Sequence, residues 1–574
     1  MRLALLGFAL LGFAGCATPV PTDDDDPTPE PTPAPVGCAP TEWTEPPACG
    51  SGPVARGGLL PGPGDAGFDA DLAGRVTEHD RLFHAVFAWS TGVNTEVSID
   101  LDESALLDTF MASDSWDFEE ATGRPVTDLV TSWGKAAGLY AGVGIAADAY
   151  RYGALRDEGA PCAEVDRARE LLLRSLQGLH RASAITGVPG VIARGYARVD
   201  HPGAGATVET TPLFDDDGAP LPEEKDNGTW RDDNSADGAY SDYVWEDSCS
   251  RDMLMGWATA YGAVWEVVGL DPTIDAAVKS ELVEDATALA RSLMTVQDSG
   301  FDLEIRDADG RRTFHGILHE ESIDTVYTPG IYNGPNAMMA AGAAAALATV
   351  AQDAEVQEWL EGQLLGERRL HELARDRSGI LDFGVNTNFS GYNMVFTGGL
   401  LAERLVCDDE ARGVFAVALH DVLYDPEGEE RQPVEQAQAL YDLAGLAGQR
   451  VARAWGSADE APDEAVLGQL LDTLTGFPSA PYVDSYVENC DADEITSGVC
   501  VGVDGVTQIT VLEATGWNDA VVAAEPIPWS IRPPSNYHWR SNPYEVNRGD
   551  PSGSRLLPAV DLRFAYWAAR WQRR

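Results

Sequence analysis

The chain has 574 residues and carries 39 Lys and Arg against 93 Asp and Glu, a formal net charge of −54. Such a surface repels nucleic acid and anionic lipid, so we expect neither as a direct partner. Because the acidic residues are dispersed and 44% of the residues are apolar, the composition predicts a folded protein with a solvated acidic surface rather than a disordered chain.

The first residues have the pattern of an export signal. Met1 and Arg2 precede an apolar run over residues 3–14, which is too short to stay in a bilayer as a spanning helix. The sequence Phe-Ala-Gly-Cys at residues 13–16 resembles the bacterial lipoprotein signal. This resemblance implies that residues 1–16 are a signal segment, that Cys16 carries lipid, and that the protein belongs to the cell envelope, with Ala17 favouring the outer membrane. The alternative is an ordinary secretory signal cleaved near Ala17.

Residues 17–66 are predicted to be a tether. They hold an acidic run over residues 23–26 and a Pro/Thr-rich run, which favour an extended, unpacked chain. Residues 67–574 are expected to form a single monomeric domain. No later apolar run is long enough to cross a membrane, so the lipid is the predicted membrane contact.

The eight cysteines suit an oxidising compartment. Two close pairs in loops, Cys38 with Cys49 and Cys490 with Cys500, are predicted disulfides. Cys162, Cys249 and Cys407 are left over near predicted helix ends. The sequence has no CxxC motif and no histidine placed to complete a metal site, and it lacks nucleotide-binding glycine motifs, so we expect no metal and no cofactor.

Apolar side chains recur at helical spacing along most of the domain. Helices are predicted over residues 129–155, 164–185, 247–268, 272–296, 337–352, 357–375, 389–405, 409–423, 434–455, 463–474 and 559–571, with a small β excursion over residues 303–315 and an irregular insertion over residues 477–530. The absence of heptads and of a repeated motif excludes a coiled coil and a solenoid. A mainly α fold remains, and an α/α toroid of six helical hairpins fits it best. Long loops rich in aromatic and polar residues would then crowd a single mouth.

The stretch over residues 226–269 organises the candidate site. A polar loop runs into a helix with an apolar stripe, and it brings Asp247, Arg251 and Asp252 to the N-terminal end of that helix. The segments I-A-R-G at residues 192–195 and W-E-D-S-C-S-R-D at residues 245–252 resemble the six-hairpin glycosidase-like proteins. The resemblance implies cleavage at an anomeric carbon by two carboxyl groups, for which Asp247 and Asp252 are the candidates. The predicted sugar-binding side chains here are Arg194, Tyr196, Trp230, Trp245 and Arg251. In the structural alternative, Asp247 is an N-cap and Asp252 complements the helix dipole.

A second group contains His315, His319 and Tyr332. The histidines are four residues apart, which would place both on one helical face, but residue 316 is Gly where a zinc protease motif has Glu. Such a His/Tyr/Arg set also suits β-elimination of a uronate. Asn386, Asn388 and Tyr392 resemble a motif of toroid polysaccharide lyases, although Phe389 stands where that motif has His.

A third group, His538, Trp539 and Arg540, would close a binding mouth or form a hydrogen-bonded loop. The sequence therefore predicts an envelope lipoprotein that acts on polysaccharide or oligosaccharide, as a glycoside hydrolase. The alternatives are a uronate polysaccharide lyase and a non-catalytic glycan-binding or scaffolding lipoprotein.

Overall fold

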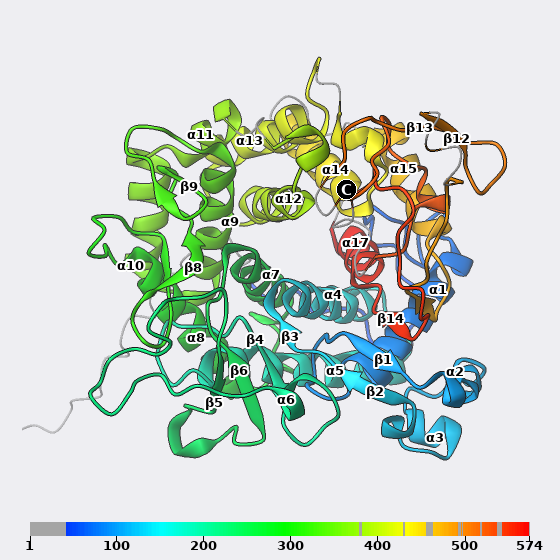
Figure 1. Ribbon diagram of the computed structural model, residues 1–574, viewed down its shortest axis with the longest axis horizontal. Helices are drawn as coiled ribbons and strands as arrows, with labels where there is room; N and C mark the ends of the chain where they lie inside the picture. Colours follow the sequence, from blue (N-terminus) through cyan, green and yellow to red (C-terminus); the bar gives the residue numbers. More distant parts are fainter. Residues whose placement is uncertain are drawn as a thin grey trace, which may run out of the picture. The chain divides into compact units, whose positions relative to one another are not determined.

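The structure is a computed structural model that describes residues 42–377, 381–428, 431–454, 463–491, 495, 498–516, 519–535 and 542–572. Residues Val36–Arg574 belong to one compact unit, which is mainly helical (Figure 1). The predictions for the lipid-bearing Cys16, for Cys38, and for His538, Trp539 and Arg540 lie outside the described residues.

Six helices of the described chain contact one another in a closed circuit, which we call the helix circuit. They are α4 (Gly138–Asp157), α7 (Arg251–Val268), α9 (Gly334–Ala351), α12 (Phe389–Leu405), α14 (Ala439–Ala454) and α17 (Val560–Trp571). Each packs against the next, and α17 packs against α4 (Figure 1). In α9 every residue except Pro335 is buried, as expected for a helix that is covered on all sides.

Further helices pack on the helix circuit. These are α1 (Ala70–Leu82) on α17, α5 (Cys162–Ala184) on α4, α8 (Ala276–Met294) and α11 (Leu370–Arg377) on α9, α13 (Asp409–Val417) on α12 and α14, and α15 (Glu464–Gly476) on α14. The shorter helices are α2 (Ser104–Met111), α3 (Phe118–Thr122), α6 (Ala204–Thr207), α10 (Ala354–Glu358), η1 (Phe83–Phe87), η2 (Leu101–Glu103), η3 (Val126–Asp128), η4 (Ala236–Gly238), η5 (Trp359–Glu367), η6 (Gly384–Asn386), η7 (Ala418–Tyr424), η8 (Pro433–Gln436) and η10 (Trp529–Ile531). The mainly α prediction is therefore confirmed.

The strands are short, and all the paired strands run antiparallel in the described residues. One sheet has the order β11 (Tyr482–Val483), β14 (Arg555–Leu557), β1 (Val97–Ile99), β2 (Val130–Trp133), and another has the order β3 (Ala136–Ala137), β4 (Gly195–Arg198), β6 (Tyr243–Glu246), β5 (Trp230–Asp232). Two-stranded sheets are formed by β7 (Glu304–Arg306) with β8 (Arg312–Ile317), β9 (Ser322–Ile323) with β10 (Val326–Tyr327), and β12 (Val499–Val501) with β13 (Gln508–Thr510). The β7–β8 hairpin confirms the predicted β excursion.

Glycines set the distance between neighbouring helices of the circuit. A Cβ added to Gly256 of α7 would overlap the backbone of Gly138 and Leu139 of α4. In the same way, a Cβ on Gly342 of α9 would overlap the backbone of Gly398 of α12. Only glycine allows backbones to approach this closely, which suits the many small residues of α9.

The N-terminal ends of neighbouring circuit helices meet. The Leu139 N–H lies 3.3 Å from the sulfur of Met253, so the starts of α4 and α7 are adjacent. The Arg251 side chain reaches Asn336 at the start of α9, and Tyr441 of α14 donates to Asn393 of α12. The long segments that carry the strands precede α4, α7, α9 and α17. Loop side chains therefore collect at these N-terminal ends.

Three sequence predictions are corrected by the fold. Residues 130–137 form β2 and β3 instead of the first turns of a helix, because β3 pairs with β4. The helix predicted over residues 357–375 is divided among α10, η5 and α11. The predicted tether is too long, because Leu59 and Leu60 are buried and their N–H groups donate to Gln572 and Ala569.

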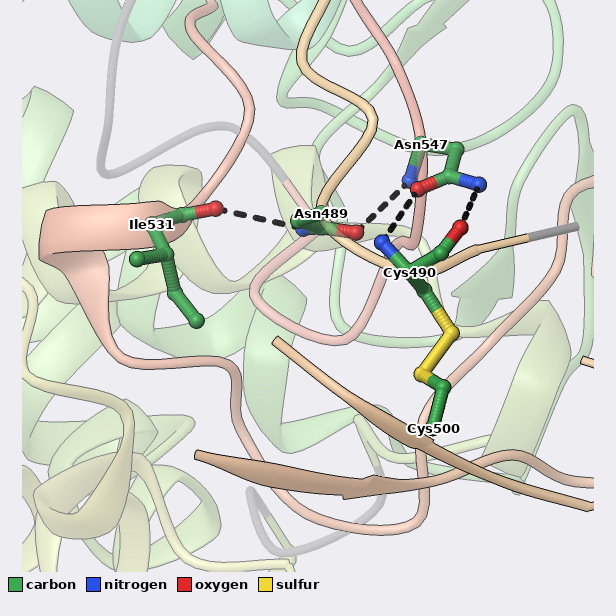
Figure 2. Close-up of a disulfide and its surroundings, with 5 residues drawn as sticks. All are labelled: Asn489, Cys490, Cys500, Ile531 and Asn547. Carbon is green, nitrogen blue, oxygen red and sulfur yellow. Dashed lines mark hydrogen bonds between the residues drawn. A yellow bond between two sulfur atoms is a disulfide. The ribbon is translucent and has the colours of Figure 1, made fainter. Parts of the chain in front are cut away.

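The disulfides differ in part from the predicted pairs. Cys490 and Cys500 form the expected bond, beside a reciprocal pairing of the Asn547 side chain with the Cys490 backbone (Figure 2). Cys49 is bonded to Cys162 rather than to Cys38, and this bond fastens residues before α1 to the start of α5. Cys407 is also disulfide-bonded, whereas Cys249 is a buried free thiol.

Candidate functional site

Arg194 joins two carboxylates at the N-terminal end of α7. Its guanidinium donates to the Ser250 hydroxyl at 2.6 Å and lies 3.7 Å from the Glu246 carboxylate. The Ser250 hydroxyl in turn donates to Asp252, and Lys135 forms an ion pair with Glu246. Strand β6 delivers Glu246 and the first turn of α7 delivers Asp252, so rigid elements hold both groups. We call Lys135, Arg194, Glu246, Ser250 and Asp252 the α7 cluster.

Arg251 extends this arrangement toward α9. Its guanidinium lies 3.1 Å from the Asp324 carboxylate and 3.3 Å from the Asn336 side-chain oxygen. The Nδ1 atom of His315 lies 2.9 Å from the same Asp324. The structure thus brings the predicted residues Arg194, Arg251, Asp252 and His315 to neighbouring positions at the ends of α7 and α9.

Asp247 lies beneath the cluster in a buried ionic network. Its carboxylate accepts from the Arg231 guanidinium at 2.6 and 3.0 Å and from the Thr229 N–H at 2.9 Å. Lys225 lies 3.4 Å away and forms an ion pair with Asp307, whose pKa burial raises to about 6. Asp247 is 1% exposed, and its carboxylate already meets protein donors. It is not the N-cap of α7, which is Ser250.

Two aromatic residues predicted to stack on sugar are core residues. Tyr196 and Trp245 are fully buried, and they donate to the backbone oxygens of Gly178 and Asp232, each at 2.9 Å. They present no ring face to a ligand, which corrects their assignment as sugar-binding residues. Trp230 on β5 is half-buried and Tyr332 is 47% exposed, so these two keep accessible surface.

His319 does not share a helical face with His315, because His315 lies on strand β8 and His319 lies beyond its end. The His319 Nδ1 accepts the Glu321 N–H at 3.0 Å, and its Nε2 lies 3.6 Å from Asp302. Burial lowers the pKa of His319. Within the described residues no group of three or more His, Cys, Asp or Glu is arranged to hold a metal ion.

A second polar group, unforeseen from the sequence, lies at the N-terminal end of α14. Asp442 is fully buried and accepts from the Tyr424 hydroxyl at 2.9 Å and the Gln469 amide at 2.6 Å through one oxygen. Its other oxygen has no hydrogen-bond partner among the described residues. Burial raises the pKa of Asp442 to about 7, because a charged carboxylate loses its hydration there.

Arg532 lies beside Asp442 and is 5% exposed. Its guanidinium donates to the backbone oxygens of Ile527 and Gln436, both at 2.8 Å. Burial lowers the pKa of Arg532 to about 10. In the described part of the chain its third nitrogen, NH1, has no partner, and neither side-chain atom of the fully buried Gln438 has one. We call Gln436, Gln438, Asp442 and Arg532 the α14 cluster.

Aromatic rings line the neighbouring end of α12. Phe396 of α12 stacks on Tyr441 of α14 with ring centres 4.4 Å apart. Phe389, about two turns nearer the start of α12, contacts Tyr392 and Tyr544. Phe389 also lines a surface cavity of about 860 Å³. The cavity is lined by Thr387, Asn388, Phe389, Ser390, Asp519, Ala520, Val521, Asn542, Glu545, Val546, Asn547 and Arg548. Asn388, from the predicted lyase-like run, is the N-cap of α12, and its side chain accepts the Ser390 N–H.

Comparisons with protein-family models, with curated proteins and with solved structures found no match to this chain. Among the described residues, none of the helices combines the length and the apolarity needed to cross a bilayer.

Proposed function

We propose that this chain is a lipid-anchored protein of the bacterial cell envelope that hydrolyses glycosidic bonds in a polysaccharide or oligosaccharide. In this proposal the helix circuit and its outer helices form an α/α toroid of six hairpins, and the α7 cluster is its catalytic site. The supporting observation is the connection of Glu246 and Asp252 through Arg194 and Ser250. Two carboxyl groups held on rigid elements are what glycoside hydrolysis requires.

The surroundings of the two carboxyl groups suggest their roles. Glu246 lies between the cations Lys135 and Arg194, so we assign it as the base or nucleophile. Asp252 has no ion-pair partner among the described residues, and a proton on Asp252 would leave no cation unpaired. We therefore assign Asp252 as the acid that protonates the leaving oxygen. Arg251, with His315 and the exposed Tyr332, would bind the sugar from the side of α9.

The test is a panel of polysaccharides incubated with the full chain and assayed for new reducing ends. Glu246→Gln and Asp252→Asn should each lower turnover by about 100-fold or more, because each removes a proton-transfer group or a nucleophile. Asp71→Asn is the matched control, because Asp71 is an exposed carboxylate in the first turn of α1, and it should keep wild-type turnover. Full turnover in either α7 variant contradicts the assignment.

The same panel separates the other two functions. Products that absorb as unsaturated uronates would indicate a polysaccharide lyase, since β-elimination leaves a new double bond. Binding to a glycan without any product would indicate a glycan-binding lipoprotein.

A further inference from the structure

The atoms without partners in the α14 cluster lie on segments that contact one another. The Asp442 N–H donates to the Gln438 backbone oxygen at 3.0 Å, one turn back along the chain. Arg532 donates to the Gln436 backbone oxygen at 2.8 Å. Tyr441, next to Asp442, donates to Asn393 of α12, whose side-chain nitrogen also lacks a partner in the described chain. The cluster therefore joins the start of α14 to the segment that carries Arg532, and Asn393 of α12 lies next to it.

Such a group is unusual inside a protein. Buried polar atoms are nearly always hydrogen-bonded, and those that are not point to strain, a bound molecule or ordered water. Here the atoms include both ends of the Gln438 amide, one Asp442 oxygen and the Arg532 NH1. The Arg532 guanidinium hydrogen-bonds to backbone oxygens and to no carboxylate among the described residues, and a buried guanidinium without an ion pair is costly. An anionic ligand that also carries hydroxyl groups would supply hydrogen-bond partners for all of these atoms.

We propose that the α14 cluster binds a uronic acid unit of an acidic glycan. The Arg532 NH1 would donate to the sugar carboxylate, and the Gln438 amide, which both donates and accepts, would bind neighbouring ring hydroxyls. This choice of ligand rests on the proposed function. It narrows the proposed substrate from glycans in general to glycans that contain uronic acid.

A carboxylate suits this cluster better than a phosphate group. Only the NH1 nitrogen of one guanidinium is available, and the Asp442 oxygen without a partner lies in the same cluster. A doubly charged phosphate would face this carboxyl group with a single cation to balance it. A singly charged carboxylate is balanced by Arg532 alone.

The test measures binding of the sodium salt of glucuronic acid to the full chain by calorimetry, with glucose and acetate as the comparison ligands. We expect glucuronate to bind at least about tenfold more tightly than either, since glucose lacks the carboxylate and acetate lacks the hydroxyls. Gln438→Leu should abolish the difference between glucuronate and acetate. Gln363→Leu, which changes an exposed glutamine on η5, should leave glucuronate binding unchanged.

Two results would overturn the proposal. One is glucuronate binding no tighter than glucose or acetate in the wild type. The other is a lower melting temperature for unliganded Gln438→Leu than for the wild type, which would show that ordered water already pairs with the amide; the proposal predicts a higher one. Glucuronate is not cleaved, so its binding is measured independently of hydrolysis. Hydrolysis of neutral glycans without glucuronate binding would overturn only this inference, and glucuronate binding without any hydrolysis would overturn only the proposed catalysis.

Discussion

The N-terminal ends of α7 and α14 both hold a buried aspartate near an arginine, but their side chains are paired differently. Beside α7, the Asp247 carboxylate meets Arg231 through two hydrogen bonds, and a backbone N–H and Lys225 complete its surroundings. Beside α14, Asp442 and Arg532 each keep an atom with no partner in the described chain. We therefore expect a structural role for Asp247 and Arg231 and a ligand-binding role for Asp442 and Arg532.

The completeness of its hydrogen bonding indicates whether a buried charged group has a structural or a functional role. A buried ion pair with complete hydrogen bonding holds segments together, and removing one partner leaves an uncompensated charge. A buried polar group that lacks a hydrogen-bond partner does not stabilise the fold by itself. Its hydrogen bonds can be completed by a ligand or by ordered water. At the end of α7 the residues that we propose to be functional, Arg194 and Asp252, are half-buried and lie outside this network.

The largest loss of stability is expected from breaking the ion pair of Arg231 with Asp247 at the start of α7. Arg231→Met would leave Asp247 buried without its guanidinium and should cost about 3–5 kcal/mol of unfolding free energy. Urea denaturation followed by circular dichroism measures the loss. Arg198→Met removes a pair with Asp200, which is half exposed, and should cost less than about 1 kcal/mol. Equal losses in the two variants would contradict the structural role of the network.

A smaller loss of stability is expected from moving α7 away from α4. This change would move the start of α7 and its ionic network together. Gly256→Ala places a Cβ on the backbone of Gly138 and Leu139 and should cost about 1–3 kcal/mol. Gly468 of α15 has open space around the position of a Cβ, so Gly468→Ala should instead stabilise the protein by about 0.5–1 kcal/mol. Thermal melting of both variants measures the contrast, and a shift in the same direction for both would contradict it.

A third effect, a dependence of stability on pH, is expected at the start of α14. The raised pKa of Asp442, about 7 against a usual 3.8, means that the folded chain keeps a proton that the unfolded chain releases. Wild-type stability therefore falls as pH rises from about 4 to about 7 through this group, and the loss is complete above pH 7. Asp442→Asn has no such proton, so its stability relative to wild type should increase over that interval. A relative stability that stays constant across the interval contradicts the burial argument.

Local patterns in the sequence predicted most of the helices. The range of α12 is the predicted one, because Asn388 supplies a cap and the apolar spacing from Phe389 onward is helical. The strands β2 and β3 were mistaken for helix because β3 is fixed by pairing with β4, a contact distant in sequence. The same limit explains Cys49, whose true partner Cys162 is far along the chain.

The candidate site was predicted in part. Arg194, Arg251 and Asp252 were selected because polar residues clustered around a helix start, and His315 was selected for its spacing from His319. The four residues lie near one another. Tyr196 and Trp245 were assigned to the mouth because residue type does not show which way a side chain on a strand points. The α14 cluster was missed because Asp442 and Arg532 come from distant segments, and an absent hydrogen bond is visible only in three dimensions.

The most direct measurement of the central claim is reducing-end formation from a panel of neutral and uronic acid polysaccharides, with the wild type beside Asp252→Asn and Asp247→Asn. The account predicts hydrolysis by the wild type that is lost in Asp252→Asn, and retained in the fraction of Asp247→Asn that folds. No reducing ends from any polysaccharide, or full hydrolysis by Asp252→Asn, would contradict the account.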